Sequence, residues 1–270
     1  MVVQHNLQAA NTNRMLGQNV KAVSKSTEKL SSGYQVNRAA DDAAGLSISE
    51  KMRNQIRGIN QAVKNSEDGV SLIQTAEGNM NEIHSILQRM GELATKAAND
   101  VNASDDRTAI DDEMKQLTEE IDSIAKKAAF NGTYLLRGSF TNKQLQVGAV
   151  AGENMSITIS SMKASKIGVA GLKVSSHKVA SSAMTAITKA IKQVSTARSK
   201  LGAIQNRLNY TINNLENYSE NLTAAESQIR DTDMATEMTN YTKNNILQQA
   251  AQSMLAQSNQ STQGVLSLLQ

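Results

Sequence analysis

The sequence has no cysteine, no proline and no tryptophan, and only 3% of its 270 residues are aromatic. Without cysteine the chain forms no disulfide and offers no thiol for catalysis. Without proline no residue is obliged to break a helix, and large rigid side chains are too few to fill a wide core. Alanine, the branched aliphatic residues and 12 methionines must provide the packing, so we expect a mainly α-helical chain.

Charge is missing from both ends of the chain, although a fifth of all residues are Asp, Glu, Lys or Arg. Residues 244–270 carry no charged side chain, and Arg14 is the first residue with a fixed side-chain charge at the other end. Three interpretations fit such ends: frayed termini, helices lying on a membrane surface, and helices packed against other protein chains.

The composition of these ends favours contacts with protein. A helix on a membrane surface usually carries Lys or Arg along its polar face, and residues 244–270 have neither. Their apolar side chains are too few to offset the entropy lost when the segment orders alone. Uncharged polar side chains can be buried between helices if they are hydrogen-bonded. We therefore expect the two ends to pack against each other and against copies of the same protein.

Long apolar runs and a concentrated basic stripe are also missing from the sequence. No segment reaches the roughly 18 to 20 apolar residues that span a bilayer, and residues 1–13 lack the pattern of a secretory signal. The formal charge of +3 comes from Lys and Arg scattered among acidic residues. We expect a soluble chain without a removable signal, and neither membrane insertion nor nucleic-acid binding.

Apolar residues recur with helical spacing over most of the chain. The first stripe runs from Leu16 to Leu30 and stops at residues 31–33. A second stretch, Asp42 to Asn99, would form a helix about 87 Å long. A third begins at Ser104, which we expect to be the N-cap with two aspartates in the first turn.

The middle of the sequence changes from helical to alternating spacing. Met155, Ile157 and Ile159 alternate with polar residues, which is typical of a strand, and AVAGEN before them reads as a turn. Helical spacing resumes at about Ala180. The fold class expected is mainly α: an elongated antiparallel coiled-coil or helical bundle with one small β-hairpin region and both termini at one end.

No constellation of side chains points to catalysis or to a bound metal. The three histidines, His5, His84 and His177, lie far apart in different expected elements. Paired aspartates stand at helix starts or on solvated faces, and neither a phosphate loop nor GxSxG occurs. We expect no enzyme activity, no catalytic residue, no metal and no cofactor.

Two segments resemble the signatures of one family. Residues 30–62, LSSGYQVNRAADDAAGLSISEKMRNQIRGINQA, resemble the N-terminal signature of bacterial flagellin, and residues 225–270 resemble its C-terminal signature. FNGTYLL and LQVGAVAGENMSITIS resemble the β segment of the family. The resemblance implies a secreted, extracellular subunit of the flagellar filament, the polymer that drives swimming. Because few residues separate the β segment from the returning helix, it also implies a core-only flagellin without outer domains.

The resemblance also implies an arrangement and partners. Residues 1–40 would form an inner-tube helix and spoke, residues 41–180 outer rods with a hairpin at about 139–175, residues 181–225 a returning rod, and residues 226–270 the second inner-tube helix. Implied partners are other copies of the chain, an export chaperone, the filament cap and hook-filament junction proteins. A junction protein is itself the alternative function. The residues expected in inner-tube contacts are Leu7, Leu16, Val20, Val23, Leu247, Met254, Leu255, Leu266 and Leu269.

One further stretch suggests recognition by the immune system. Residues 87–100 resemble the segment through which many flagellins engage the Toll-like receptor that senses them, and Arg89, Leu93 and Glu113 would be the contacts. Arg89 and Leu93 are one helical turn apart, so they could equally form a contact between subunits. Gly91 departs from the bulkier residue often found at its position, so we expect weak receptor binding.

Overall fold

The computed structural model describes residues 6–267, with side chains described as far as residue 261. The chain divides into two compact units. The terminal unit comprises residues 1–56 and 220–270, and the central unit comprises residues 57–219. Helices α2 (Ala43–Ala97) and α5 (His177–Arg230) contribute to both units.

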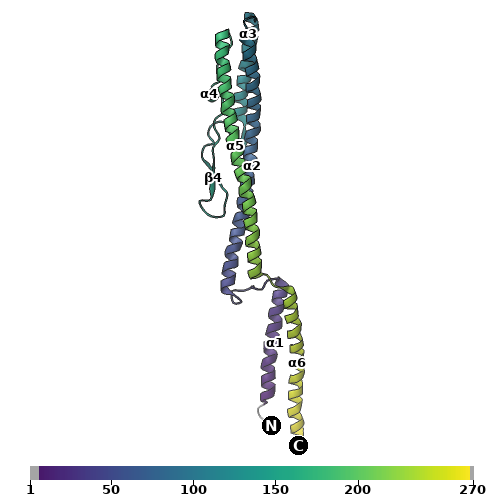
Figure 1. Ribbon diagram of the computed structural model, residues 1–270. Coiled ribbons are helices and arrows are strands. Elements are labelled where there is room, and N and C mark those ends of the chain that lie inside the picture. The colour runs from purple at the N-terminus through teal and green to yellow at the C-terminus, as the bar shows by residue number, and fades with distance from the viewer. Residues whose placement is uncertain (1–5, 268–270) are drawn as a thin grey trace. The chain divides into compact units, whose positions relative to one another are not determined.

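The terminal unit is built on two antiparallel helices that lie side by side, α1 (Leu7–Ser32) and α6 (Met234–Ser267) (Figure 1). The side chain of Asn6 caps α1 by accepting a 2.9 Å hydrogen bond from the amide of Ala9. The helix ends at Gly33, whose φ of 76° favours glycine and whose N–H donates to the carbonyl of Lys29. The predicted end at residues 31–33 is therefore confirmed.

In the terminal unit, the connection from α1 to α2 lies beside the connection from α5 to α6. The amide of Gln35 donates to the carbonyl of Arg230 at 2.7 Å, and that of Thr232 donates to the carbonyl of Gly33 at 2.9 Å. Asp42 begins α2, because its carboxylate accepts from the amide of Gly45 at 2.9 Å. The two connections are thus joined by backbone hydrogen bonds.

The central unit packs three helices around one apolar core. Helix α3 (Ser104–Lys127) returns antiparallel to α2, and α5 runs alongside them (Figure 1). The prediction that Ser104 caps α3 was wrong by one residue. Ala103 is the N-cap, and its amide donates to the carboxylate of Asp106 at 3.3 Å, so a side chain inside the first turn satisfies the helix end. The largest fully buried side chains of the three helices are Ile59, Ile73, Met80, Ile83, Leu87, Met90, Met114, Ile121 and Ile187.

The predicted hairpin is present, and a second, smaller one accompanies it. Strands β3 (Lys143–Gln146) and β4 (Asn154–Ile157) pair antiparallel, with Lys143 opposite Ile157. Strands β1 (Ala129–Phe130) and β2 (Thr133–Tyr134) also pair antiparallel, around a turn in which Asn131 and Gly132 have positive φ. Between β4 and α5 there is only the short helix α4 (Ala164–Ile167), so no outer domain is inserted there. The mainly α fold class is confirmed.

Candidate self-assembly interface

Helices α1 and α6 meet along a seam that is largely polar. In each helix the partly or fully buried positions recur every three or four residues, which places them on one face. On α1 they include Asn6, Ala9, Thr12, Leu16, Asn19, Val23 and Ser26. On α6 they include Glu237, Tyr241, Asn244, Gln248, Ala251, Leu255 and Ser258. Leucine occupies few of these positions, namely Leu16 and Leu30 on α1 and Leu255 on α6, and amides, hydroxyls and small side chains fill most of the rest.

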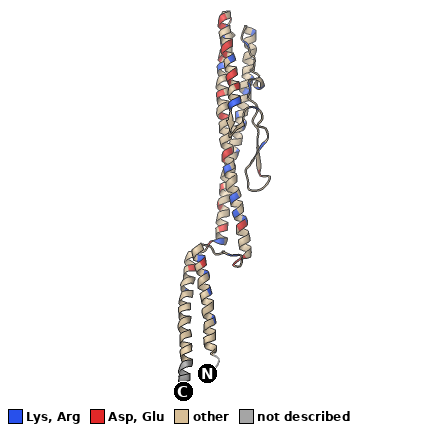
Figure 2. Ribbon diagram, turned by 180° about the vertical axis from the view of Figure 1, so that it is seen from behind, with Lys and Arg blue, Asp and Glu red and all other residues tan. Residues whose placement is uncertain are grey.

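Polar contacts fix both ends of this seam. Near the termini, the side-chain amide of Asn6 donates to the carbonyl of Ser258 at 3.2 Å, and the hydroxyl of Ser258 donates back to Asn6 at 3.3 Å. At the other end the ammonium of Lys29 lies 3.8 Å from the carboxylate of Glu237. Because a shift of either helix would break these pairs, they define the register. Beyond Lys243 the described part of α6 carries no charge, as Figure 2 shows.

The larger apolar side chains of the pair lie mostly outside the seam. Leu7 is 76% exposed, Val20 44%, Leu247 42% and Met254 54%. They are joined by Met15, Met234, Met238 and Ile246, each at least 48% exposed. Exposed apolar side chains therefore remain on both helices of the pair.

The nine residues predicted in inner-tube contacts thus fall into three groups. Four are exposed outside the seam: Leu7, Val20, Leu247 and Met254. Three are half-buried within the helix pair: Leu16, Val23 and Leu255. Leu266 belongs to the last turns of α6, where side chains are not described, and Leu269 lies outside the described residues. The sequence did not separate the first two groups.

Charged side chains reinforce the connections in the terminal unit. The carboxylate of Glu50 pairs with the guanidinium of Arg230 at 3.0 Å, and that guanidinium lies 4.6 Å from the ring centre of Tyr34. Lys25 pairs with Asp41 at 2.8 Å. The hydrogen bond from Lys25 lowers the pKa of Asp41, and the one from Arg230 lowers the pKa of Glu50. Sequence reasoning missed this network, since its partners are as much as 180 residues apart.

The three predicted receptor contacts come together in the central unit. The guanidinium of Arg89 lies 3.0 Å from the carboxylate of Glu113, so helices α2 and α3 share an ion pair on the surface. Hydrogen bonds to Glu113 and to Glu92 raise the pKa of Arg89. Arg89, Glu113 and Leu93 line one groove between α2 and α3. Leu93 is only 3% exposed, and it belongs to the core beneath the ion pair. A Cβ at Gly91 would lie 3.8 Å from Ile187, on the side facing α5 and away from Arg89.

Within residues 6–267, no helix is long and apolar enough to cross a bilayer. Over the same residues, no three His, Asp or Glu side chains are grouped so that they could hold a metal ion. The helix pair of the terminal unit leaves apolar side chains of both α1 and α6 exposed.

Family models match both ends of the chain. The bacterial flagellin N-terminal helical region matches residues 3–141, and the bacterial flagellin C-terminal helical region matches residues 184–269. The chain is 53% identical to the flagellin of Halalkalibacterium halodurans and 48% identical to that of Bacillus subtilis, and each alignment spans the whole of both proteins. A flagellar filament core protein of Treponema maltophilum is 44% identical, again over the whole of both proteins.

Solved structures agree with this likeness. The crystal structure of Bacillus cereus flagellin superposes with a TM-score of 0.50 at 29% identity, covering 56% of this chain and 88% of that one. A protein described as a flagellar hook-associated protein of Vibrio parahaemolyticus has a TM-score of 0.60 at 15% identity, covering 71% of this chain and 100% of that one, which shows a shared fold alone. This chain belongs to the bacterial flagellin family. Flagellins are structural proteins of the flagellar filament and not enzymes, as the sequence predicted.

Proposed function

We propose that the terminal unit forms the innermost layer of the filament, with the exposed apolar side chains of α1 and α6 buried between neighbouring copies. The observation that carries this proposal is the distribution of polar and apolar side chains in the helix pair. Polar residues occupy the seam within one chain, and residues such as Leu7, Leu247 and Met254 are left outside it. In a polymer these side chains gain apolar contacts that a single chain does not supply.

The experiment is polymerisation of the purified chain, followed by sedimentation and electron microscopy. We expect the full chain to form filaments, and a chain lacking residues 244–270 to stay monomeric while its central unit keeps its helical circular dichroism. Filaments formed by the truncated chain would contradict the proposed role of α6.

The proposed location is the extracellular filament. An export chaperone would deliver the chain, a filament cap would assist its assembly, and junction proteins would join the filament to the hook. A junction protein is the alternative role within the same family fold. In motile cells, replacing the native flagellin gene with this one distinguishes them. Long filaments indicate the filament subunit, and a bare hook with a short extension indicates the junction protein.

We also propose a weak interaction of the free chain with the flagellin-sensing Toll-like receptor. Arg89 and Glu113 support it, since both reach the surface of the central unit from different helices. Leu93 would support the patch from the core and not by direct contact. Arg89→Ala should reduce the response of a receptor reporter assay, whereas Gly91→Arg should not enhance it, because that side chain would face α5. An unchanged response to Arg89→Ala would exclude this patch as the receptor-binding site.

A further inference from the structure

Charge in the central unit is separated between its helices. Residues 154–215, which comprise β4, α4, most of α5 and the connections between them, contain nine Lys and Arg and no Asp or Glu. Residues 67–122, which span parts of α2 and α3 and the turn between them, contain fourteen acidic and four basic residues, a formal charge of −10. The scattered charge read from the sequence was therefore wrong for this unit, since the overall charge of +3 hides two opposite excesses.

The basic excess forms a row along the outer face of α5. Lys178, Lys189 and Lys200 follow one another at intervals of eleven residues, which is three helical turns or about 16 Å. All three are exposed, on the side away from the buried Ile187 and Val194. Of the nine cations, Arg198 alone forms an ion pair within the described residues, with Glu77.

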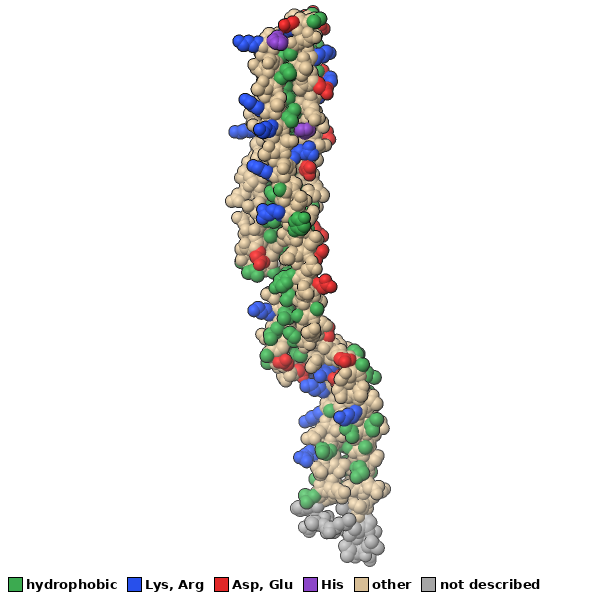
Figure 3. Space-filling model, viewed as in Figure 1, with side chains coloured by type: hydrophobic (Ala, Val, Ile, Leu, Met, Phe, Trp, Pro, Cys, Tyr) green, Lys and Arg blue, Asp and Glu red, His purple; other side chains and the backbone are tan. Residues whose placement is uncertain are grey.

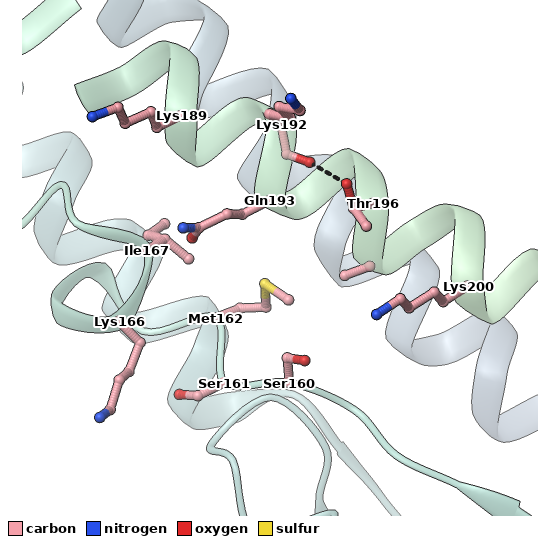
Figure 4. A pocket seen from close by; sticks show the side chains of 11 residues that line it. Ser160, Ser161, Met162, Lys166, Ile167, Lys189, Lys192, Gln193, Thr196 and Lys200 are labelled. Atoms are coloured by element: carbon pink, nitrogen blue, oxygen red, sulfur yellow. Dashed lines mark hydrogen bonds between the residues drawn. The ribbon is translucent and has the colours of Figure 1, made fainter. Parts of the chain in front are cut away.

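A groove of about 630 Å³ follows this basic row. It lies between α5 and residues 160–167, and Met162, Ile167 and Ala197 provide apolar lining (Figure 4). Four lysines surround it, and no carboxylate is among its lining residues: Lys166, Lys189, Lys192 and Lys200. Its chemistry suits a segment that presents carboxylates together with methylene groups.

The acidic excess forms a row of its own along α3. Asp105, Asp112 and Glu119 recur every seven residues, two helical turns or about 10 Å apart. All three are exposed, on the face opposite the buried Met114 and Ile121. In the upper part of Figure 3, Lys and Arg gather on the left over α5, where carboxylates are few, whereas carboxylates lie along the right edge over α2 and α3 together with some basic side chains.

We infer that the basic row of one copy binds the acidic row of a neighbouring copy in the filament. This inference rests on the proposed function, because it requires a homopolymer. A helical polymer of identical chains is built from heterologous contacts, in which one face meets a different face of the next copy. A row of one sign cannot pair with itself, since like charges brought together are unfavourable, whereas the two rows are complementary. Each copy thus carries both halves of the contact.

Reversal of each row tests the inference. One variant carries Lys189→Glu with Lys200→Glu, and the other carries Asp112→Lys with Glu119→Lys. The assay is sedimentation of the purified full chain, seeded with filament fragments, at about 0.1 M salt, where the screening length is about 10 Å. We expect each variant alone to leave at least about tenfold more unpolymerised chain than the wild type, because like charges then meet at every contact. Circular dichroism of each monomer checks that it is folded.

Recombination of the two variants is the decisive control. An equimolar mixture pairs all-acidic copies with all-basic copies, so it should polymerise to within about threefold of the wild-type level. The chain with all four substitutions keeps the net charge of +3 and should also polymerise alone. The proposed pairing would be overturned if neither the mixture nor the chain with four substitutions polymerised. Normal polymerisation of either double variant alone would overturn it as well. If only the basic-row variant is defective, that row binds another anionic partner and the inference is wrong. Failure of the wild type itself would contradict the proposed function instead.

Discussion

Leu247 offers a clean separation between the stability of the chain and the stability of the polymer. It lies on α6 outside the seam and remains 42% exposed, so Leu247→Asp leaves the charge in water in the free chain. A surface substitution of this kind changes the free energy of unfolding by about 0.5 kcal/mol or less. The thermal midpoint of the monomer should therefore be nearly unchanged.

In the polymer, by contrast, the same substitution is expected to be costly, because Leu247 is then buried against a neighbouring copy. Full burial of a leucine side chain contributes roughly 2 to 3 kcal/mol, so covering its remaining exposed part is worth about 1 kcal/mol. An unpaired carboxylate in the same place adds a desolvation cost of several kcal/mol. A total loss of about 3 kcal/mol per subunit corresponds to a roughly hundredfold rise in the concentration of chain left unpolymerised.

The assay combines circular dichroism melting of the monomer with sedimentation of the polymer, and Leu247→Met and Leu247→Ala serve as matched controls. The methionine variant should polymerise almost normally, and the alanine variant should be weakened by less than about tenfold. Leu255→Asp is a less selective probe, because Leu255 is half-buried in the seam and its loss affects the monomer too. Normal polymerisation of Leu247→Asp would refute the proposed contact surface.

Three further predictions concern the terminal unit and the methionines. Gly33→Ala should lower the thermal midpoint because its φ of 76° costs a side chain about 1 to 2 kcal/mol, whereas Gly17→Ala, in the open interior of α1, should raise stability by about 0.5 to 1 kcal/mol; equal shifts would contradict the assigned cap. The pKa values of Asp41 and Glu50 are lowered on folding, so their contribution to the stability of the fold is present above an unfolded pKa of about 4 and is lost as pH falls through the lower folded value. Between pH 6 and pH 3 the thermal midpoint should therefore decrease less for Asp41→Asn than for the wild type. Dilute hydrogen peroxide should oxidise the exposed Met15, Met234, Met238 and Met254 of the free chain before the buried Met80, Met90 and Met114; peptide mass spectrometry that finds equal rates would count against this exposure pattern.

The sequence predicted the helices of the central unit because their buried faces are apolar. Ile73, Met80 and Leu87 recur every seven residues and are fully buried, so the spacing that defined the second stretch also describes the core of the central unit. Boundaries were accurate where one residue type decides them, as Gly33 does at the end of α1. They were less accurate at Ala103, where an acidic residue inside the helix does the capping.

The polar seam could not be found from the same pattern. Asn6, Asn19 and Gln248 are hydrophilic, so a search for apolar stripes assigned contacts to the leucines on either face alike. A search for uncharged polar residues at spacings of three and four would have detected it. The burial of Leu93 depends on where α3 and α5 pack against α2, which the sequence of α2 alone does not contain. The separation of charge was readable from the acid-free residues 154–215, but the total composition concealed it.

The uncharged ends of the sequence follow from the arrangement of the helix pair. If the leucines and methionines lay in the seam, α1 and α6 would form a self-sufficient pair with a polar outside. Instead the seam is polar and hydrogen-bonded, as between Asn6 and Ser258, and apolar residues such as Leu7 and Met254 remain outside. Charges on that outer surface would have to be desolvated whenever another chain covers it. Contacts with other copies would stabilise this pair by mass action. We therefore expect α1 and α6 to be more ordered in chains that have joined the polymer than in free chains.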